Sequence, residues 1–398
     1  MELMEKKGFQ QTEVGLIPKD WNVKLLGDIG APKMCKRIFN YQTKKRGDIP
    51  FYKIGTFGKK PDAFIARELY EEYKRKYSFP LNGSVLISAA GTIGRLIVYA
   101  GGDEYFQDSN IVWIENDEKL VTNHFLKYVF PSVNFKTEGS TISRLYNNIL
   151  KSGEFACPGI SEQKAIANAL SDVDELITNL DKLIAKKKDI KKGAMQQLLI
   201  VNENLKTKTI RDVATYRRGS FPQPYGLAKW YDDISGMPFV QVVDVAKNMK
   251  LKAETKQKIS EEGAKMSVFV KKGSVILTIQ GSIGRICITQ YDAYVDRTLL
   301  IFESFKEDFN TYFFMISIWL KFQIEKEKAP GGIIKTITKE ALSSFEISFP
   351  NIEEQDRIAE VLEDIEKEIN MLESKKEKYQ AIKQGMMQEL LTGKTRLI

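Results

Sequence analysis

Two stretches of the chain combine basic, amide and aromatic side chains in a way that suits contact with a nucleic acid. They are residues 33–46 (KMCKRIFNYQTKKR) and 216–231 (YRRGSFPQPYGLAKWY). Arg and Lys suit guanine or phosphate, and Asn or Gln suits adenine. The candidate DNA-contacting residues are Lys33, Lys36, Arg37, Asn40, Tyr41, Gln42, Lys44, Lys45 and Arg46 in the first stretch and Tyr216, Arg217, Arg218, Gln223, Tyr225, Lys229 and Trp230 in the second. For any one of these residues, a solvated polar loop is at least as good an explanation as a DNA contact.

A second candidate for phosphate chemistry is the pattern G-[TS]-I-G-R, which occurs at residues 91–95 and again at 281–285. It lacks the lysine and following hydroxyl that complete a phosphate-binding loop. Two glycines between apolar segments favour a tight strand-to-strand turn with positive φ. Arg95 and Arg285 beside the turns could still reach a phosphate, and Arg144 and Lys335 complete the candidate contacts.

Signatures of catalysis and metal binding are missing from the sequence. There is no G-x-S-x-G, no dinucleotide fingerprint and no N-P-P-Y or D-P-P-Y run of an amino-methyltransferase. The single histidine, His124, lies in an apolar pattern typical of a packed or surface helix residue. Cys35, Cys157 and Cys287 lie far apart, which indicates reduced, mostly buried thiols. We therefore predict no catalytic residue and no metal ligand.

Composition and charge indicate a soluble, cytoplasmic protein with a polyanionic partner. The 398 residues include no apolar run of membrane-spanning length and no secretory leader. The formal charge is +8. It lies on the globular parts, because the net charges of the two long helical segments described below are small and nearly cancel each other. Excess positive charge on the globular parts favours binding to a polyanion. A generally lysine-rich composition is an equally good explanation from charge alone.

The elements that would position these loops begin with an internal repeat. Residues 160–199 and 352–391 are identical at about 17 of 40 positions without a gap. Apolar residues recur at alternating spacings of four and three, the seam of a coiled coil. The seam residues are Ile166, Leu170, Val173, Ile177 and Leu180 in the first copy and Ile358, Leu362, Ile365, Ile369 and Leu372 in the second. Pro158 and Pro350 precede the two helices, and Ser161 or Asn351 can cap the first turn.

The globular segments are also duplicated, at an offset near 190. Residues 83–87 (GSVLI) return as 273–277 (GSVIL), between short alternating segments that indicate a sheet with turns. In the first half we expect strands at Val23–Ile29, Ile49–Gly55, Val85–Ser88, Leu96–Tyr99 and Ile111–Ile114, and helices at 67–77 and 122–131. The predicted fold class is α+β: two mixed α/β domains separated by two long antiparallel coiled-coil helices, with pseudo-two-fold symmetry. The predicted segments are domain 1 (1–158), spacer helix 1 (159–201), domain 2 (202–350), and spacer helix 2 with the C-terminal tail (351–398).

Together these features resemble one family, the specificity subunit of type I restriction–modification enzymes. The resemblance covers nearly the whole chain. It rests on G-L-I-P-K-D-W at 15–21, the twin G-[TS]-I-G-R turns, I-x-E-Q-x-x-I-A at both helix starts, and M-M-Q-E-L-L-T-G-K-T-R at 386–396. The first helix ends instead in M-Q-Q-L-L-I-V-N, a modest departure at a connector.

The resemblance implies a non-catalytic subunit whose two target-recognition domains each read one half of a bipartite, gapped duplex DNA site, with the helices fixing the gap. It also implies docking of two methyltransferase subunits and of restriction/motor subunits, which would carry S-adenosylmethionine, ATP and Mg²⁺; this chain itself would hold no cofactor. The unequal loops predict an asymmetric target, and the isolated chain could form a homodimer. Three alternatives stay open: a helical-hairpin protein scaffold without DNA specificity, the specificity subunit of a related modification-only system, and an enzyme whose site the motifs do not reveal.

Overall fold

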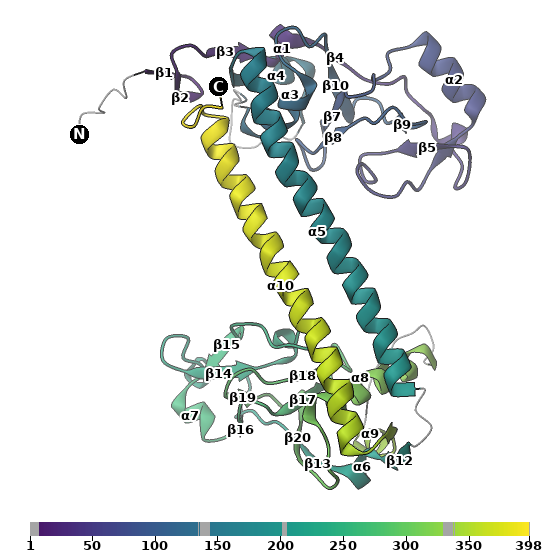
Figure 1. The fold of residues 1–398 in the computed structure, drawn as a ribbon, viewed down its shortest axis with the longest axis vertical. Helices are drawn as coiled ribbons and strands as arrows, with labels where there is room; N and C mark the ends of the chain where they lie inside the picture. The colour runs from purple at the N-terminus through teal and green to yellow at the C-terminus, as the bar shows by residue number, and fades with distance from the viewer. Residues whose placement is uncertain are drawn as a thin grey trace. The chain divides into compact units, whose positions relative to one another are not determined.

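The computed structural model describes residues 8–133, 135, 144–200, 205–328, 337 and 339–397. The chain divides into two compact units. Unit 1 contains residues 1–182 and 373–398, and unit 2 contains residues 183–372. The long helices α5 (Ile160–Ile200) and α10 (Ile352–Leu390) each contribute one half to each unit (Figure 1). Below, the first domain means residues 9–157 and the second domain residues 206–349.

The first domain is built on two small sheets. A four-stranded antiparallel sheet has the order β4 (Gly30–Lys33), β10 (Ile111–Asn116), β7 (Val85–Ser88) and β8 (Leu96–Val98). A three-stranded sheet has the order β6 (Phe64–Ile65), β5 (Ile49–Tyr52) and β9 (Tyr105–Phe106). The remaining strands form the pairs β1 (Phe9–Thr12) with β2 (Gly15–Pro18) and β3 (Asn22–Leu25) with β11 (Glu154–Cys157). The helices are α1 (Leu26–Ile29), α2 (Arg67–Lys76), α3 (Asn123–Val129), α4 (Asn147–Lys151), and the 3₁₀ turns η1 (Asn40–Gln42) and η2 (Phe130–Ser132).

The second domain repeats this plan. Its four-stranded sheet has the order β13 (Ala214–Arg218), β20 (Leu299–Phe305), β17 (Val275–Thr278) and β18 (Ile286–Ile288). The other sheet has the order β15 (Gln257–Ile259), β14 (Met237–Val240), β19 (Ala293–Val295) and β16 (Val268–Val270), and β12 (Lys206–Thr209) pairs with β21 (Glu346–Phe349). The helices are α6 (Ile210–Val213), α7 (Glu261–Ala264), α8 (Thr311–Lys328), α9 (Lys339–Ser343), and the 3₁₀ turns η3 (Ala228–Trp230) and η4 (Val242–Asp244). Two duplicated α/β domains and two long helices are therefore confirmed.

The expected strand Val23–Ile29 is wrong in its second half. Strand β3 ends at Leu25, and Leu26–Ile29 form the helical turn α1. The Asp28 carboxylate accepts a hydrogen bond from the Leu25 amide at 2.9 Å, which closes the first turn of a helix. Apolar residues spaced three apart fit one face of such a turn, and Leu26 and Ile29 are both buried.

Each long helix begins inside the core of its own unit. Ile166 and Leu170 of α5 pack in the apolar core of unit 1 with Phe125 and Phe155. Ile358 and Leu362 of α10 occupy the equivalent place in the core of unit 2. Farther along the predicted seam, Val173, Leu180 and Ile369 are buried, while Ile177, Ile365 and Leu372 are half-buried. The first seam positions of each helix thus belong to a domain core as much as to a helix pair.

Ion pairs within each unit show that α5 and α10 run antiparallel. In unit 1, Asp174 pairs with Lys383 and Asp181 with Lys376, both at 2.6 Å. In unit 2, Lys187 pairs with Glu368 at 2.7 Å and Lys191 with Glu366 at 2.5 Å. The partner on α10 moves toward lower numbers as the partner on α5 moves toward higher ones, which is the antiparallel arrangement visible in Figure 1.

Two of these pairs are copies of each other under the sequence repeat. Asp174 aligns with Glu366, and Lys191 aligns with Lys383. Burial alone would raise the pKa of both carboxyls, but hydrogen bonds from Lys383, Tyr128 and Lys127 hold the pKa of Asp174 below its usual value. Lys191 and Lys250 do the same for Glu366. Each unit therefore holds one half-buried carboxylate of the helix pair between lysines.

The helix starts differ in their caps. Asn351 precedes α10, and its side-chain oxygen accepts from the Glu354 amide at 3.0 Å, as expected. The expectation that Ser161 could cap α5 is wrong, because α5 already begins at Ile160 and Ser161 lies inside its first turn. The carbonyl of Gly159 accepts the first helical hydrogen bond there, from the Gln163 amide.

In unit 1 the beginning and the end of the described chain meet in a cluster that we call the terminal clasp: Asp20, Trp21, Glu162 and Arg396. The Arg396 guanidinium donates to Glu162 at 2.5 Å and to Asp20 at 2.8 Å, and the Trp21 indole donates to Glu162 at 2.9 Å. The Glu162 side chain is only 2% exposed. Two of the sequence motifs, G-L-I-P-K-D-W and L-L-T-G-K-T-R, supply three of the four residues.

Replacing Arg396 by alanine leaves the buried Glu162 carboxylate with the Trp21 indole as its remaining clasp partner. We predict that Arg396→Ala lowers the free energy of unfolding of unit 1 by roughly 3 kcal/mol, because removing one partner of a buried ion pair leaves the other charge uncompensated. Urea unfolding of the full chain measures the change. Lys394→Ala, at an exposed neighbouring position, is the control. Equal stability of the two variants would contradict a stabilising clasp.

The lowered pKa values also predict the acid response. Hydrogen bonding to Arg396 lowers the pKa of Asp20, and lysines lower those of Asp174 and Glu366. A carboxyl with a lowered folded-state pKa stabilises the fold fully above its unfolded pKa of about 4, and this contribution is lost as the pH falls through the folded value. The urea concentration at the midpoint of unfolding should therefore decrease once the pH falls below about 4. In Glu366→Gln, which is less stable at neutral pH, the acid loss in unit 2 should be smaller; an unchanged pH profile would contradict this assignment.

Candidate nucleic-acid interface

The two predicted loops leave equivalent strands of the two domains. Residues 33–46 follow β4 and lead toward β5, and residues 216–231 begin within β13 and lead toward β14. Strands β4 and β13 are edge strands of their four-stranded sheets. The internal duplication therefore gives each domain a variable loop at the equivalent sheet edge. The edge strand from which the loop leaves is hydrogen-bonded to another strand on one side only.

The first loop presents a basic and aromatic surface. Tyr41 is 84% exposed, and its ring stacks on that of Phe39 with centroids 5.9 Å apart. A Phe39 amide hydrogen bond to the Gln42 side chain at 2.9 Å closes the η1 turn beneath them. Phe39 was missing from the sequence-based set, because an apolar residue in a polar loop is ordinarily assigned to a core. Asn40 is exposed beside this pair.

The cations of the first loop fall into two groups. Lys33 pairs with Glu115 at 3.2 Å, Arg37 pairs with Asp108 at 2.7 Å, and the Lys36 ammonium lies 4.9 Å from the Tyr77 ring centre. The other group, Lys44, Lys45 and Arg46, is exposed and forms no ion pair with any residue that the structure describes. This second group has its charge available for an external anion.

The second loop folds back on an aromatic cluster. The ring centres of Tyr225 and Phe221 lie 4.6 Å apart, and the Arg297 guanidinium lies 5.3 Å from the Tyr225 ring. Arg218 and Gln223 are exposed. Arg217 lies 3.9 Å from Glu303, and Lys229 pairs with Glu262 at 2.8 Å. Arg297 was not in the predicted set, since it lies far from the loop in sequence and no motif marks it.

Two predicted contact residues of the second domain, Trp230 and Tyr216, form hydrogen bonds within that domain. Trp230 is only 3% exposed, and its indole donates to the Pro224 carbonyl at 2.9 Å. The Tyr216 hydroxyl hydrogen-bonds to Ser343, and its ring packs on Phe302. In this conformation both side chains are engaged within the second domain, and Trp230 presents almost no surface for a direct contact.

The twin glycine turns are strand-to-strand connections, as predicted. Residues 91–95 join antiparallel strands β7 and β8, and residues 281–285 join β17 and β18. All four glycines have φ between +66° and +80°. Ser88 and Thr278 hold the turns in the same way, each donating from its hydroxyl across the turn and accepting the amide of the arginine that ends it.

Those two arginines are held half-buried beside their turns. Arg95 donates to the Phe57 carbonyl at 2.9 Å and Arg285 to the Val245 carbonyl at 3.0 Å. Arg144 donates to the Ser109 carbonyl at 2.8 Å. The remaining predicted contact, Lys335, lies outside the described residues.

No group of three or more metal-ligating side chains comes together within the described ranges. Cys35, Cys157 and Cys287 are buried, and burial raises the pKa of Cys35 and of Cys287 to about 12, so neither is a ready nucleophile. His124 is an exposed residue of α3. None of the helices described is both long and apolar enough to cross a membrane.

Comparison with known proteins places this architecture in a family. The family model described as "Type I restriction modification DNA specificity domain" matches twice, over residues 18–191 and 202–384. A protein of Haemophilus influenzae named as a type I restriction enzyme specificity subunit is 55% identical over 155 residues, covering 39% of this chain and 40% of that relative. The MjaVIII specificity subunit of Methanocaldococcus jannaschii is 23% identical over 431 residues, covering 100% of this chain and 98% of that relative.

The fold is shared with a solved structure. The type I restriction–modification S subunit from M. genitalium superposes with a TM-score of 0.60 at 13% identity, covering 98% of both chains. The two family matches lie on the two duplicated domains and extend along both long helices. The chain therefore belongs to the type I restriction–modification DNA specificity family and is a non-catalytic specificity subunit that recognises a target sequence.

Proposed function

We propose that each globular domain reads one half of a bipartite, gapped and asymmetric duplex DNA target, with the half-sites read by loops 33–46 and 216–231. The observation that carries this proposal is the contrast between repeated frame and divergent loop. The two domains share strand order and turn sequence, while the loops at the same sheet edge share little sequence. Different side chains on equivalent loops would select different bases, so the two half-sites would differ.

The proposed base and phosphate contacts are the exposed or half-buried members of the predicted set. In the first domain they are Lys33, Lys36, Arg37, Asn40, Tyr41, Gln42, Lys44, Lys45, Arg46, Arg95 and Arg144; in the second they are Tyr216, Arg217, Arg218, Gln223, Tyr225, Lys229 and Arg285. The arginines and lysines already paired with carboxylates would exchange or share those partners on binding. Lys44, Lys45, Arg46 and Arg218 could bind without breaking an ion pair to any described residue.

The helices are proposed to set the gap between half-sites, with recognition domains at 1–158 and 202–350 and helical segments at 159–201 and 351–398. Because α5 and α10 are continuous and each contributes to both units, a change in helix length would alter the separation that the domains can read. A helix of 41 residues rises about 60 Å, and one base-pair step is about 3.4 Å. A spacer of this kind would measure distance in addition to sequence.

The helices are also proposed to dock two methyltransferase subunits, with restriction/motor subunits joining the assembly. Exposed apolar side chains on both helices support this: Ile190 is 44% exposed on α5 and the aligned Ile382 is 40% exposed on α10. Leu176 and Met371 add further exposed apolar surface. S-adenosylmethionine, ATP and Mg²⁺ would then act on the partner subunits, and the same surfaces could pair two copies of the isolated chain.

The gap proposal predicts the effect of lengthening the helices. Inserting four residues between Asp181 and Lys187 of α5, together with four between Glu368 and Lys376 of α10, extends the pair by about 6 Å. We expect the methylated motif to keep both half-sites and to lengthen its gap by about one or two base pairs. Sequencing of modified bases in a methylation-free host gives the motif. An unchanged gap in a variant that still methylates would contradict the spacer role.

The loop proposal predicts that each domain controls only its own half-site. Arg46→Ala should relax base preference in one half of the motif and Arg218→Ala in the other, each losing about 1–3 kcal/mol of discrimination at one base pair. The variants serve as controls for one another, because each leaves the opposite domain intact. If both arginines alter the same half-site, or if neither changes the motif, base reading by these residues is wrong.

A further inference from the structure

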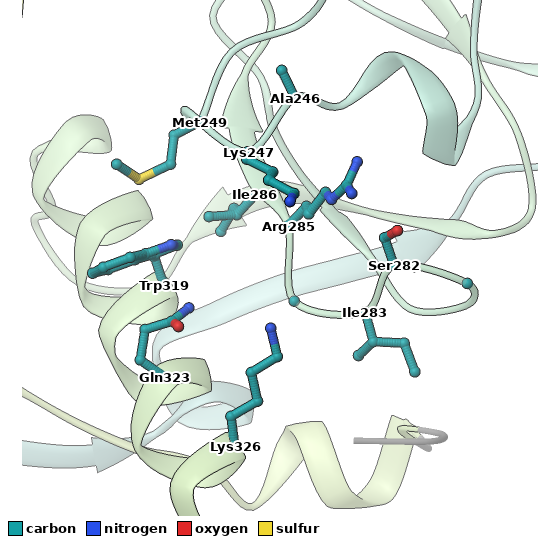
Figure 2. Close-up of a pocket in the computed structure, with 12 residues that line it drawn as sticks. Ala246, Lys247, Met249, Ser282, Ile283, Arg285, Ile286, Trp319, Gln323 and Lys326 are labelled. Carbon is teal, nitrogen blue, oxygen red and sulfur yellow. The ribbon is translucent and has the colours of Figure 1, made fainter. Parts of the chain in front are cut away.

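The most distinctive unassigned feature of unit 2 is a cavity beside the glycine turn at residues 281–285. Its volume is about 550 Å³, and its lining comes from the turn, from the segment after η4 and from α8 (Figure 2). Three cations line it, Lys247, Arg285 and Lys326, together with the polar side chains of Ser282 and Gln323. No Asp or Glu is among its lining residues. The cavity is therefore electropositive.

The charges in this cavity are not neutralised within the described part of the chain. Lys247 and Lys326 form no ion pair there. In Figure 2 the Lys326 side chain extends from α8 toward the turn, and the end of the Lys247 side chain is drawn near Arg285. Arg285 is fixed by its hydrogen bond to the Val245 carbonyl, which accounts for only one of its donors. The backbone amides of Gly281 and Ser282 also donate to no described residue. Convergent cations and free turn amides are the elements of an anion site.

The first domain contains a smaller version of the same site. A cavity of about 240 Å³ is lined by Lys59, Ser88, Arg95 and the turn residues Gly91 and Thr92, again without a carboxylate. Arg95 is fixed to the Phe57 carbonyl as Arg285 is to the Val245 carbonyl. Lys59 and Lys247 lie at nearly the same offset as the two turns. The same combination of cavity, fixed arginine and lysine therefore occurs in both domains.

We propose that these two cavities, which we call the turn pockets, are phosphate clamps that hold the DNA backbone independently of its sequence. This inference rests on the proposed function and assigns phosphate contacts and base reading to different residues. The turn residues G-x-I-G-R are the same in both domains, whereas the loops proposed to read bases differ. Two domains that read different half-sites have the sugar–phosphate backbone in common, so a contact kept identical in both suits phosphate rather than base.

The shared chemistry of the ligand is a phosphate group, which a free nucleotide also carries. The lining favours DNA. A nucleotide site of the magnesium-dependent kind usually binds the metal through one or two carboxylates, and neither turn pocket has a carboxylate among its lining residues. Each is also open at a polar turn beside exposed lysines, which suits a backbone running past.

The test is the salt dependence of binding by the full chain, in complex with its methyltransferase subunits, to target and non-target duplexes. In Lys247→Ala/Lys326→Ala, we expect the slope of log affinity against log salt to become shallower by about 2 for both duplexes, because each lost phosphate contact removes about one counterion. The ratio of target to non-target affinity should stay unchanged. Lys271→Ala/Lys272→Ala, on an exposed turn of the same domain outside the pocket, should leave the slope unaltered.

Three results would overturn the proposal: an unchanged slope in the pocket variant, an equal loss in the control variant, or a loss confined to the target duplex, which would mark base readers. Calorimetric titration with ATP separates the two phosphate sources, since ATP binding that disappears in the pocket variant would assign the pocket to a nucleotide. The wild-type ratio of target to non-target affinity tests sequence recognition independently. If the wild type prefers the target duplex but the pocket variant keeps the wild-type salt slope, the phosphate-clamp proposal is wrong and the proposed function is retained.

Discussion

The antiparallel pairing of α5 and α10 frames both units, and within each unit a half-buried carboxylate joins the two helices. Asp174 in unit 1 and Glu366 in unit 2 are each contacted by lysines, and each retains its charge because those lysines offset the desolvation. An ion pair that is partly removed from water contributes little net stability, but any arrangement that separates its partners is penalised. We interpret the repeated pairs as devices that fix helix register, since a slip of either helix would leave a charge uncompensated.

This register gives the duplication its functional meaning. The first residues of each helix are part of a domain core, through Ile166 and Leu170 in one unit and Ile358 and Leu362 in the other. Each globular domain is therefore built around the start of its helix instead of being attached to it by a flexible linker. The terminal clasp reinforces unit 1, where Arg396 joins the end of the chain to Asp20 near its beginning. The variable loops can then diverge at the sheet edges without disturbing the frame.

The sequence predicted the repeated frame well because its signals are local and periodic. Strand β7 coincides with the predicted Val85–Ser88, α2 ends one residue before the predicted 67–77, and the twin turns have the positive φ that their glycines indicated. Contacts between residues distant in sequence were not predictable. Nothing local to Trp230 shows that it is buried in a cluster with Phe239 and Ile259. Nothing near Lys326 places it beside Arg285. The strand expected at Val23–Ile29 was wrong from Leu26 onward, because a short apolar segment can form either a strand or a helical turn.

In the proposed function, one chain reads two different half-sites at a fixed separation. The most direct measurement is base-modification sequencing of a methylation-free host that expresses this chain with its methyltransferase subunit. We expect a single gapped motif with two unlike halves and one modified adenine on each strand. A motif with two identical halves, or a continuous motif without a gap, would contradict it. So would a genome without any motif when the two proteins are shown to associate.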